Sequence, residues 1–228
     1  MSKAHALADL RERILSQDIP PGSDLDEAGL CDTYGISRTP LREVLHRLAG
    51  DGYVQLADNR SAKVASMDLE TLRTFFQTAP LIYCNVARLA AENRSTAQLD
   101  ALKDIQMAFA QSDDPAQTAL LNHQFHALIG AMARNPYLVA SLNRMLIDHT
   151  RLSQTFFRPS SAAEIALTQK AVAQHDAMIT AIEAQETALV VDLTLQHWDL
   201  SRNRMERFVR PDPLPLDVIS MKDHRHAL

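Results

Sequence analysis

Arginine and hydroxyl side chains cluster at the start of residues 37–50, a stretch with helical spacing. Ser37 is a candidate helix N-cap, and Arg38 and Arg42, four residues apart, share one face. Arginine can donate two hydrogen bonds to guanine and small hydroxyls can hold phosphates, so this face suits a DNA major groove. An ordinary amphipathic helix with a solvated charged face is the alternative. The apolar residues recur on a different face: Leu41, Val44, Leu45 and Leu48.

Histidines in the second half of the chain form the other candidate for chemistry. Asn122 and His126 share one helix face, and His175 and His197 lie in apolar helical surroundings further along the chain. One such side chain from each of three helices can meet in a bundle core, where metal sites are often built. A hydrogen-bonded core histidine at each position is the alternative. His123 and His149 are interpreted as surface residues or as neighbours of such a site.

The elements that position the arginines occupy the first 66 residues. Helices are predicted over 4–16 and roughly 26–34, and a compact turn at 34–36 leads into the helix that Ser37 opens and Gly50 ends. This order is a helix–turn–helix with a tight glycine-containing turn.

A small hairpin is predicted directly after the arginine helix. Residues 52–56 and 62–65 have strand-like patterns on either side of a turn cluster. A hairpin in this place is a wing, and its Arg60 and Lys63 could contact phosphates or enter a minor groove. A hairpin with a basic tip that binds nothing is the alternative.

The histidines fall in a second half that is helical almost throughout. Short connections between long helices indicate an antiparallel bundle, and prolines end regular structure near 211. The chain is therefore predicted to be mainly α, with a winged helix–turn–helix at 1–66, a helical domain at 67–210 and a tail at 211–228. The predicted long helices are 69–92, 96–111, 115–133, 136–157, 161–184 and 187–209.

Composition limits the class of protein. With 228 residues, 46% of them hydrophobic, the chain can bury a sizeable core. The net charge of −5 argues mildly against nucleic acid, so any basic footprint is local. Cys31 and Cys84 are expected to be buried free thiols. No membrane-spanning or leader-like stretch is found, and a cytoplasmic protein is expected.

The motif at 34–52 points to a known family. Tyr-Gly-Ile-Ser-Arg-Thr-Pro-Leu-Arg-Glu-Val-Leu-His-Arg-Leu-Ala-Gly-Asp-Gly, preceded by Pro21-Gly22-x-x-Leu25, resembles the GntR family of bacterial transcription regulators. The helical second half resembles its FadR-type branch, whose ligand domain is called FCD. The resemblance spans about residues 5–210, and implies base contacts by Arg38 and Arg42.

The resemblance also assigns the other DNA contacts. It implies that Ser37 and Thr39 hold phosphates and that Arg47 contacts the DNA backbone or is a surface charge. Two departures weaken the interface: Ser61 replaces the usual wing glycine, and the second helix has no basic residue.

A metal site follows from the resemblance rather than from spacing. Many FadR-type ligand domains hold a divalent metal with an Asp or Asn and three histidines, and this pattern maps onto Asn122, His126, His175 and His197. Three imidazoles suit zinc or nickel. Asn122, in place of the commoner Asp, supplies no charge, so weaker binding is expected. The open coordination positions would suit a small carboxylate.

The usual effector anchor is missing. Relatives often carry an arginine and a glutamate early in the first bundle helix, where this chain has Ala79 and Tyr83. Arg134 and Arg151 are the candidate replacements for binding an effector, with solvated charges as the alternative.

The leading interpretation is a transcription regulator, expected to be a repressor, that binds a palindromic DNA operator as a homodimer. A small organic or sugar acid would be sensed beside the metal. A metal-dependent enzyme and a plain helical interaction domain are the alternatives. The enzyme is disfavoured because no nucleophile motif and no Glu-x-x-His pair are present.

Overall fold

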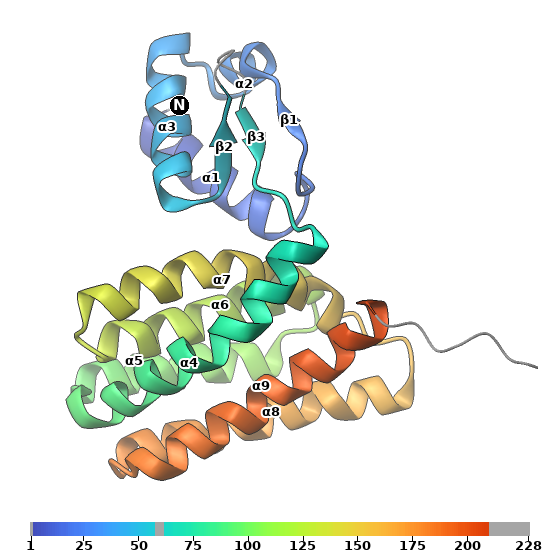
Figure 1. Ribbon diagram of the computed structural model, residues 1–228. Coiled ribbons are helices and arrows are strands. Elements are labelled where there is room, and N and C mark those ends of the chain that lie inside the picture. The colour runs from blue at the N-terminus through green and yellow to red at the C-terminus, as the bar shows by residue number, and fades with distance from the viewer. Residues whose placement is uncertain (1, 58–61, 210–228) are drawn as a thin grey trace, which may run out of the picture.

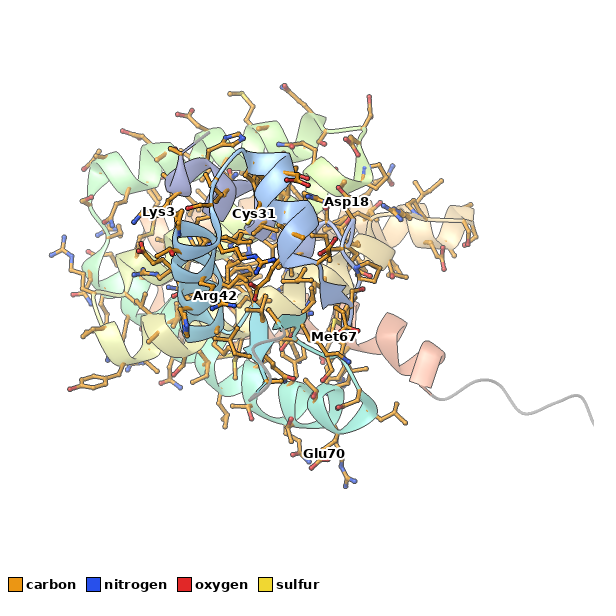
Figure 2. All side chains as sticks on the ribbon, turned by 90° about the horizontal axis from the view of Figure 1, so that it is seen from above. Lys3, Asp18, Cys31, Arg42, Met67 and Glu70 are labelled. Atoms are coloured by element: carbon orange, nitrogen blue, oxygen red, sulfur yellow. The ribbon has the colours of Figure 1, made fainter. Side chains whose placement is uncertain are left out.

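The computed structural model describes residues 2–57 and 62–209, which form two parts, one above the other in Figure 1. The upper part, here called the head, contains α1 to α3 and a small sheet; the lower part, the helical domain, contains α4 to α9. Seen from above, the head lies over the helical domain (Figure 2). The predicted fold class is confirmed. Within the described residues, no helix has the length and apolar character to cross a membrane.

The head is a winged helix–turn–helix with a three-stranded antiparallel sheet in the order β1-β3-β2. The third strand was not predicted: β1 has only two residues, and Asp24 pairs with Lys63 far along the chain. Arg60 and Ser61 lie outside the described residues. The elements of the head are α1 (Lys3–Leu15), β1 (Asp24–Leu25), α2 (Glu27–Tyr34), α3 (Arg38–Asp51), β2 (Val54–Leu56) and β3 (Ala62–Val64).

Glycines close both helices of the motif. Gly35 follows α2 with a φ of 60°, a left-handed conformation that a glycine adopts without strain. The predicted end of α3 at Gly50 is wrong, because the helix continues to Asp51 and Gly52 ends it with a φ of 89°. The N–H groups of Gly52 and Tyr53 bond back to carbonyls of the last turn. The predicted apolar stripe of α3 is buried in the core of the head.

The helical domain consists of long helices that begin at polar caps. Asp68 accepts from the N–H of Thr71 at the start of α4, and Ser95 and Gln98 form a capping box at α5. Cys31 and Cys84 are free, but they are half-buried rather than buried. The helices are α4 (Leu69–Asn93), α5 (Thr96–Gln111), α6 (Pro115–Met132), α7 (Pro136–Phe156), α8 (Ala162–Glu183) and α9 (Thr187–Val209).

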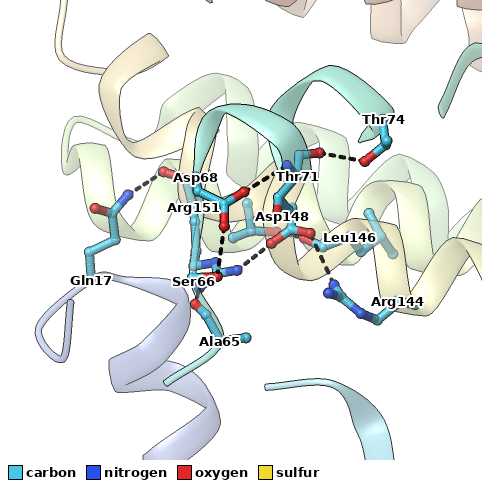
Figure 3. A network of polar contacts seen from close by, with 11 residues as sticks. Gln17, Ala65, Ser66, Asp68, Thr71, Thr74, Arg144, Leu146, Asp148 and Arg151 are labelled. Atoms are coloured by element: carbon cyan, nitrogen blue, oxygen red, sulfur yellow. Dashed lines mark hydrogen bonds and ion pairs between the residues drawn. The ribbon is translucent and has the colours of Figure 1, made fainter. Parts of the chain in front are cut away.

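The head is held to the helical domain through α7. Ile147 of α7 belongs to the apolar core of the head. Arg151, with 0% of its surface exposed, pairs with Asp148 and donates to the carbonyl of Ala65 at 2.7 Å. Figure 3 shows this arginine between α7 and the segment that leads into α4.

Two glutamines complete the junction. Gln17, just after α1, donates to the backbone carbonyl of Arg151 (Figure 3). Gln154 of α7 donates to the carbonyl of Leu15 at 3.1 Å. These bonds satisfy carbonyl groups at the end of α1 and inside the junction, so one stretch of α7 positions both the head and the linker.

Candidate DNA interface and candidate metal centre

The first turn of α3 presents exposed polar groups. Ser37 occupies the N-cap position, yet its hydroxyl makes no capping hydrogen bond. Ser37, Arg38 and Thr39 are all exposed. The free N–H groups at the start of a helix and a hydroxyl that is not used for capping together suit a phosphate.

Ion pairs within the head divide the predicted DNA-contacting cations. Among the described residues, Arg38 has no ion pair, whereas Arg42 pairs with Glu27 of α2 at 3.3 Å. Arg47 pairs with Asp51 at 3.3 Å, and Lys63 pairs with Asp24 at 3.5 Å. The acidic second helix therefore neutralises part of the face that Arg42 presents, an effect that the sequence pattern did not reveal.

Three predicted metal ligands meet in the core of the helical domain. His126 of α6, His175 of α8 and His197 of α9 are buried, and one ring nitrogen from each lies within 4.8 Å of the other two. The Nε2 atoms of His175 and His197 are 3.2 Å apart. Asn122, one turn before His126 on α6, is buried as well. The structure thus brings together imidazoles from three helices.

Two glutamines set the protonation of two of the three histidines, His175 and His197. Nδ1 of His175 lies 3.0 Å from Oε1 of Gln106, and Nδ1 of His197 lies 3.1 Å from Oε1 of Gln174. An amide oxygen only accepts, so each Nδ1 carries the proton and each Nε2 keeps its lone pair. Two lone pairs then face each other across 3.2 Å with no proton between them, an arrangement that a cation would stabilise.

The cluster fits a divalent metal on further grounds. Nε2 of His126 is buried without a hydrogen-bond partner. Burial and the neighbouring histidines hold the pKa of His126 and His175 well below the usual value, and burial lowers the pKa of His197 to about 4. All three imidazoles are therefore neutral at pH 7, which is the form that binds metals. Metal-bound histidines usually donate their other ring N–H to an oxygen acceptor, and the amide oxygens of Gln106 and Gln174 are such acceptors here.

His149 and Tyr83 lie next to the histidine cluster. Of the two expectations for His149, a surface residue or a neighbour of the site, the structure shows the second: His149 is buried, and its Nδ1 lies 2.8 Å from the Tyr83 hydroxyl. The centroids of the His149 and His126 rings are 5.2 Å apart, so this pair borders the cluster. Burial, with the charges of His197 and His123, lowers the pKa of His149 to about 3. A tyrosine where relatives carry a glutamate was the available signal, but its partner could not be found from spacing.

The two arginines offered as effector anchors are placed elsewhere. Arg134 is exposed, with a φ of 51°, beyond the end of α6 and about two turns after His126. The guanidinium of Arg151 is held by Asp148 and Ala65 at the junction. Its charge is already balanced, so we correct its expected role from effector anchor to a link between head and linker. His123 is half-buried, with Nδ1 at 2.8 Å from the Thr150 hydroxyl.

Comparisons with known proteins match both parts of the chain. Residues 76–200 match the model of the FCD domain, and residues 3–64 match that of the bacterial regulatory proteins of the gntR family. The fatty acid metabolism regulator protein of Haemophilus influenzae is 28% identical over 185 residues, covering 72% of this chain and 77% of the relative. The HTH-type transcriptional regulator RmpR of Mycobacterium gastri is 24% identical over 214 residues, covering 86% and 74%.

Solved structures share the fold. E. coli McbR/YncC superposes with a TM-score of 0.75 at 18% identity, covering 91% of this chain and 98% of that one. A GntR transcriptional regulator from Rhodococcus sp. RHA1 superposes with a TM-score of 0.70 at 14% identity, covering 90% and 97%. The head and the helical domain therefore occur together in other proteins.

Proposed function

We propose that this chain, which belongs to the GntR family of bacterial regulatory proteins and carries an FCD domain, is a repressor. In this proposal a small acid changes the affinity of the protein for DNA. GntR-family proteins with this domain are transcriptional regulators and not enzymes, which excludes the metal-enzyme alternative. In this proposal a cytoplasmic homodimer binds a palindromic operator through residues 1–66, and residues 67–210 sense the acid.

The observation that carries this proposal is that one helix contacts both functional parts. On α7, His149 lies beside the histidine cluster, while Asp148 and Arg151 hold the linker to the head. A ligand that changes the packing around His149 would alter the same helical turn that positions the head. A regulator needs such a connection, since an effector acts only through a difference between two states of the protein.

The DNA contacts that we propose centre on α3. Arg38, exposed and free of an ion pair among the described residues, would contact a base edge in the major groove, joined by Arg42. Ser37 and Thr39 would bind phosphates, and Arg47 and Lys63 would add weaker backbone contacts because each already has an acidic partner. Arg60 is proposed as a wing contact from the sequence alone.

We propose that the histidine cluster holds a divalent metal, zinc or nickel, with Asn122, His126, His175 and His197 as ligands. The neutral imidazoles and the unpartnered Nε2 of His126 support this assignment. When bound, the metal would offer open coordination positions to the oxygens of a carboxylate. The chain's own contribution is to hold the imidazoles in one tautomer through Gln106 and Gln174.

Exposed leucines support the proposed homodimer. The adjacent helices α4 and α9 expose Leu81, Leu189 and Leu195, and exposed apolar side chains of this kind are candidates for cover by a second copy. A symmetric pair of heads would match the two halves of a palindrome.

A gel-shift titration at fixed salt tests the proposal, with DNA taken from upstream of the protein's own gene. We expect sequence-selective binding, and we expect Arg38→Ala to weaken it by about 1–3 kcal/mol because a base contact is lost. Arg88→Ala is the matched control, since it removes an exposed arginine of the helical domain that pairs with Glu92. Equal binding by the wild type and the Arg38 variant would contradict the assignment.

A further inference from the structure

A narrow pocket borders the histidine cluster, and its walls indicate the chemical class of the effector. We propose that it takes a monocarboxylic acid with an apolar, ring-sized body, and not a sugar acid. This inference rests on the proposed function and narrows it. His149 and Ser153 are the polar members of the lining, and the other lining residues are apolar or aromatic: Phe75, Phe76, Leu152, Phe156 and Trp198.

Aromatic rings from two helices form one wall. The Trp198 ring of α9 lies 5.3 Å from the ring of Phe75 and 5.8 Å from that of Phe76, both on α4, measured between centroids. The His149 ring lies 5.7 Å from Trp198 and joins this wall to the cluster. Rings at these distances favour a further ring or an apolar chain, which gains by leaving water.

The two polar side chains of the lining, His149 and Ser153, each have one polar atom already engaged. His149 uses Nδ1 for the Tyr83 hydroxyl, and the Ser153 hydroxyl donates to the carbonyl of His149 at 2.8 Å. The hydroxyl groups of a sugar acid would lose their water here and find few partners. An unpaired buried hydroxyl is unfavourable, so several of them would exclude such a ligand.

Two unsatisfied groups define the polar part of the ligand. The indole Nε1–H of Trp198 is buried without an acceptor, and Trp198 itself is only 4% exposed. Nε2 of His126 is buried without a partner as well. A carboxylate could accept from the indole, and it would lie beside His149, whose ring centroid is 5.2 Å from that of His126 in the cluster. No arginine is needed to hold such an acid, which accounts for Ala79 at the usual anchor position.

The pocket must open before a ligand enters. It encloses about 260 Å³, its mouth included, and as it stands has room for about one water molecule. The adjustable wall is α4, since Pro80 lies inside this helix and has no N–H to donate to the carbonyl of Phe76. The turn that carries Phe75 and Phe76 therefore lacks one helical hydrogen bond, and Phe76 is only half-buried.

The test uses Trp198, the single tryptophan of the chain, as the reporter. The full chain, with zinc added, is titrated with benzoate and with gluconate, two monocarboxylates that differ in whether the body is an apolar ring or a hydroxylated chain. Benzoate is expected to change the Trp198 emission and raise the melting temperature. Gluconate is expected to bind at least tenfold more weakly.

Variants locate the binding. Phe76→Ala is expected to weaken benzoate binding at least tenfold and Phe76→Leu less, while Tyr137→Ala, which removes an 85% exposed ring, leaves it unchanged. The two substitutions at Phe76 also guard against loss of folding in one of them. Unchanged benzoate binding in both Phe76 variants would place the acid elsewhere and overturn the proposal.

The remaining outcomes separate this inference from the proposed function. Gluconate binding without benzoate binding would overturn the proposal of an apolar effector, while the proposal that the protein senses an acid would stand. Zinc binding with no response to either acid would also overturn the proposal of an apolar effector, while the proposed metal site would stand. Benzoate binding that persists after chelation would support the class and overturn only the role of the metal.

Discussion

The ion pair between Arg42 and Glu27 limits the charge that α3, the helix proposed to contact DNA, can offer to a phosphate or a base. The two side chains are 41% and 19% exposed, and Nε of Arg42 lies 3.3 Å from the carboxylate. A carboxylate at this place also repels phosphates. Arg42 must therefore leave an acidic partner to reach a base, while Arg38 has no such partner among the described residues.

Replacing Glu27 is expected to strengthen DNA binding. Glu27→Gln frees Arg42 and removes a negative charge, and a half-exposed pair of this kind is worth roughly 0.3–1 kcal/mol, up to about a fivefold gain in affinity. Glu70→Gln is the matched control, because it removes the same charge from α4, far from Arg42 in Figure 2. Weaker binding by the Glu27 variant in a gel shift would mean that Glu27 positions Arg42 for contact.

The tautomers of His175 and His197 depend on the side-chain amides of Gln106 and Gln174. Gln106 is itself fixed, since its Nε2 donates to the carbonyl of Val172 at 3.1 Å and to Asp176 at 2.9 Å. Its oxygen therefore faces Nδ1 of His175. This arrangement keeps Nε2 of His175, the proposed metal ligand, unprotonated and turned toward His197.

Metal affinity is expected to depend on both the imidazoles and this amide. His126→Ala removes a proposed ligand and is expected to abolish stoichiometric zinc binding. Gln106→Met removes the hydrogen-bond acceptor for His175 and is expected to lower the affinity for zinc by about 10- to 100-fold. His46→Ala, an exposed histidine of the head, is the control. Competition with a fluorescent chelator measures the affinity. Full zinc content in the His126 variant would contradict the site.

At the scale of elements, α4 connects the pocket to the linker. It begins at Leu69, directly after the segment 65–68, in which the carbonyl of Ala65 accepts a hydrogen bond from Arg151 (Figure 3). Pro80 lies between Phe76 at the pocket and Tyr83 at the cluster. A proline inside a helix removes a hydrogen bond and crowds the preceding turn, so this helix is weakest where the ligand would enter.

Replacing this proline is expected to stabilise the protein and to weaken its response. Pro80→Ala restores the N–H donor to the carbonyl of Phe76 and should raise the free energy of unfolding by about 1–3 kcal/mol. Pro136→Ala is the matched control, because a proline in the first turn of α7 costs little. Urea unfolding gives the stability, and benzoate titration gives the response. A lower free energy of unfolding for Pro80→Ala would show that the packing of α4 depends on the proline.

At the scale of the whole molecule, the head meets the helical domain at a closely packed junction and, beside it, at an open cleft. The α7 junction holds it, while an adjacent cleft of about 790 Å³ separates the two parts and is lined by Arg11, Asp51, Tyr53, His123 and Arg144 among others. The cleft leaves room for the head to tilt. The buried ion pair at the junction is then the contact that decides the position of the head.

Breaking this ion pair is expected to destabilise the protein. Arg151→Met leaves the buried Asp148 with only Arg144, at 3.0 Å, and the carbonyl of Ala65 without its donor. We expect a loss of about 2–4 kcal/mol in the free energy of unfolding, measured with urea. Adding Asp148→Leu should restore part of it, since no charge is then left buried. Arg88→Met, at an exposed ion pair, is the control. An equal loss in the double variant would contradict the role of the pair.

Much of the fold could be predicted because its signals are local. Helix spacing, caps such as Asp68 and Ser95, and breakers such as Pro136 depend on residues within a few positions of one another. The strand β1 was missed because two residues carry no pattern, and it exists only through pairing with β3. The end of α3 was misplaced because two glycines lie close together and only the backbone conformation distinguishes them.

The sequence by itself determined the helix after Ser37 that is proposed to contact DNA, its arginines and the histidines of the candidate metal site. These follow from residue type and from a family resemblance with a regular pattern. Only the tertiary structure decided which charges are paired and which are available. Glu27 meets Arg42, Tyr83 meets His149, and Arg151 is buried at the junction. Each of these contacts joins separate elements, and only the folded packing brings such partners together.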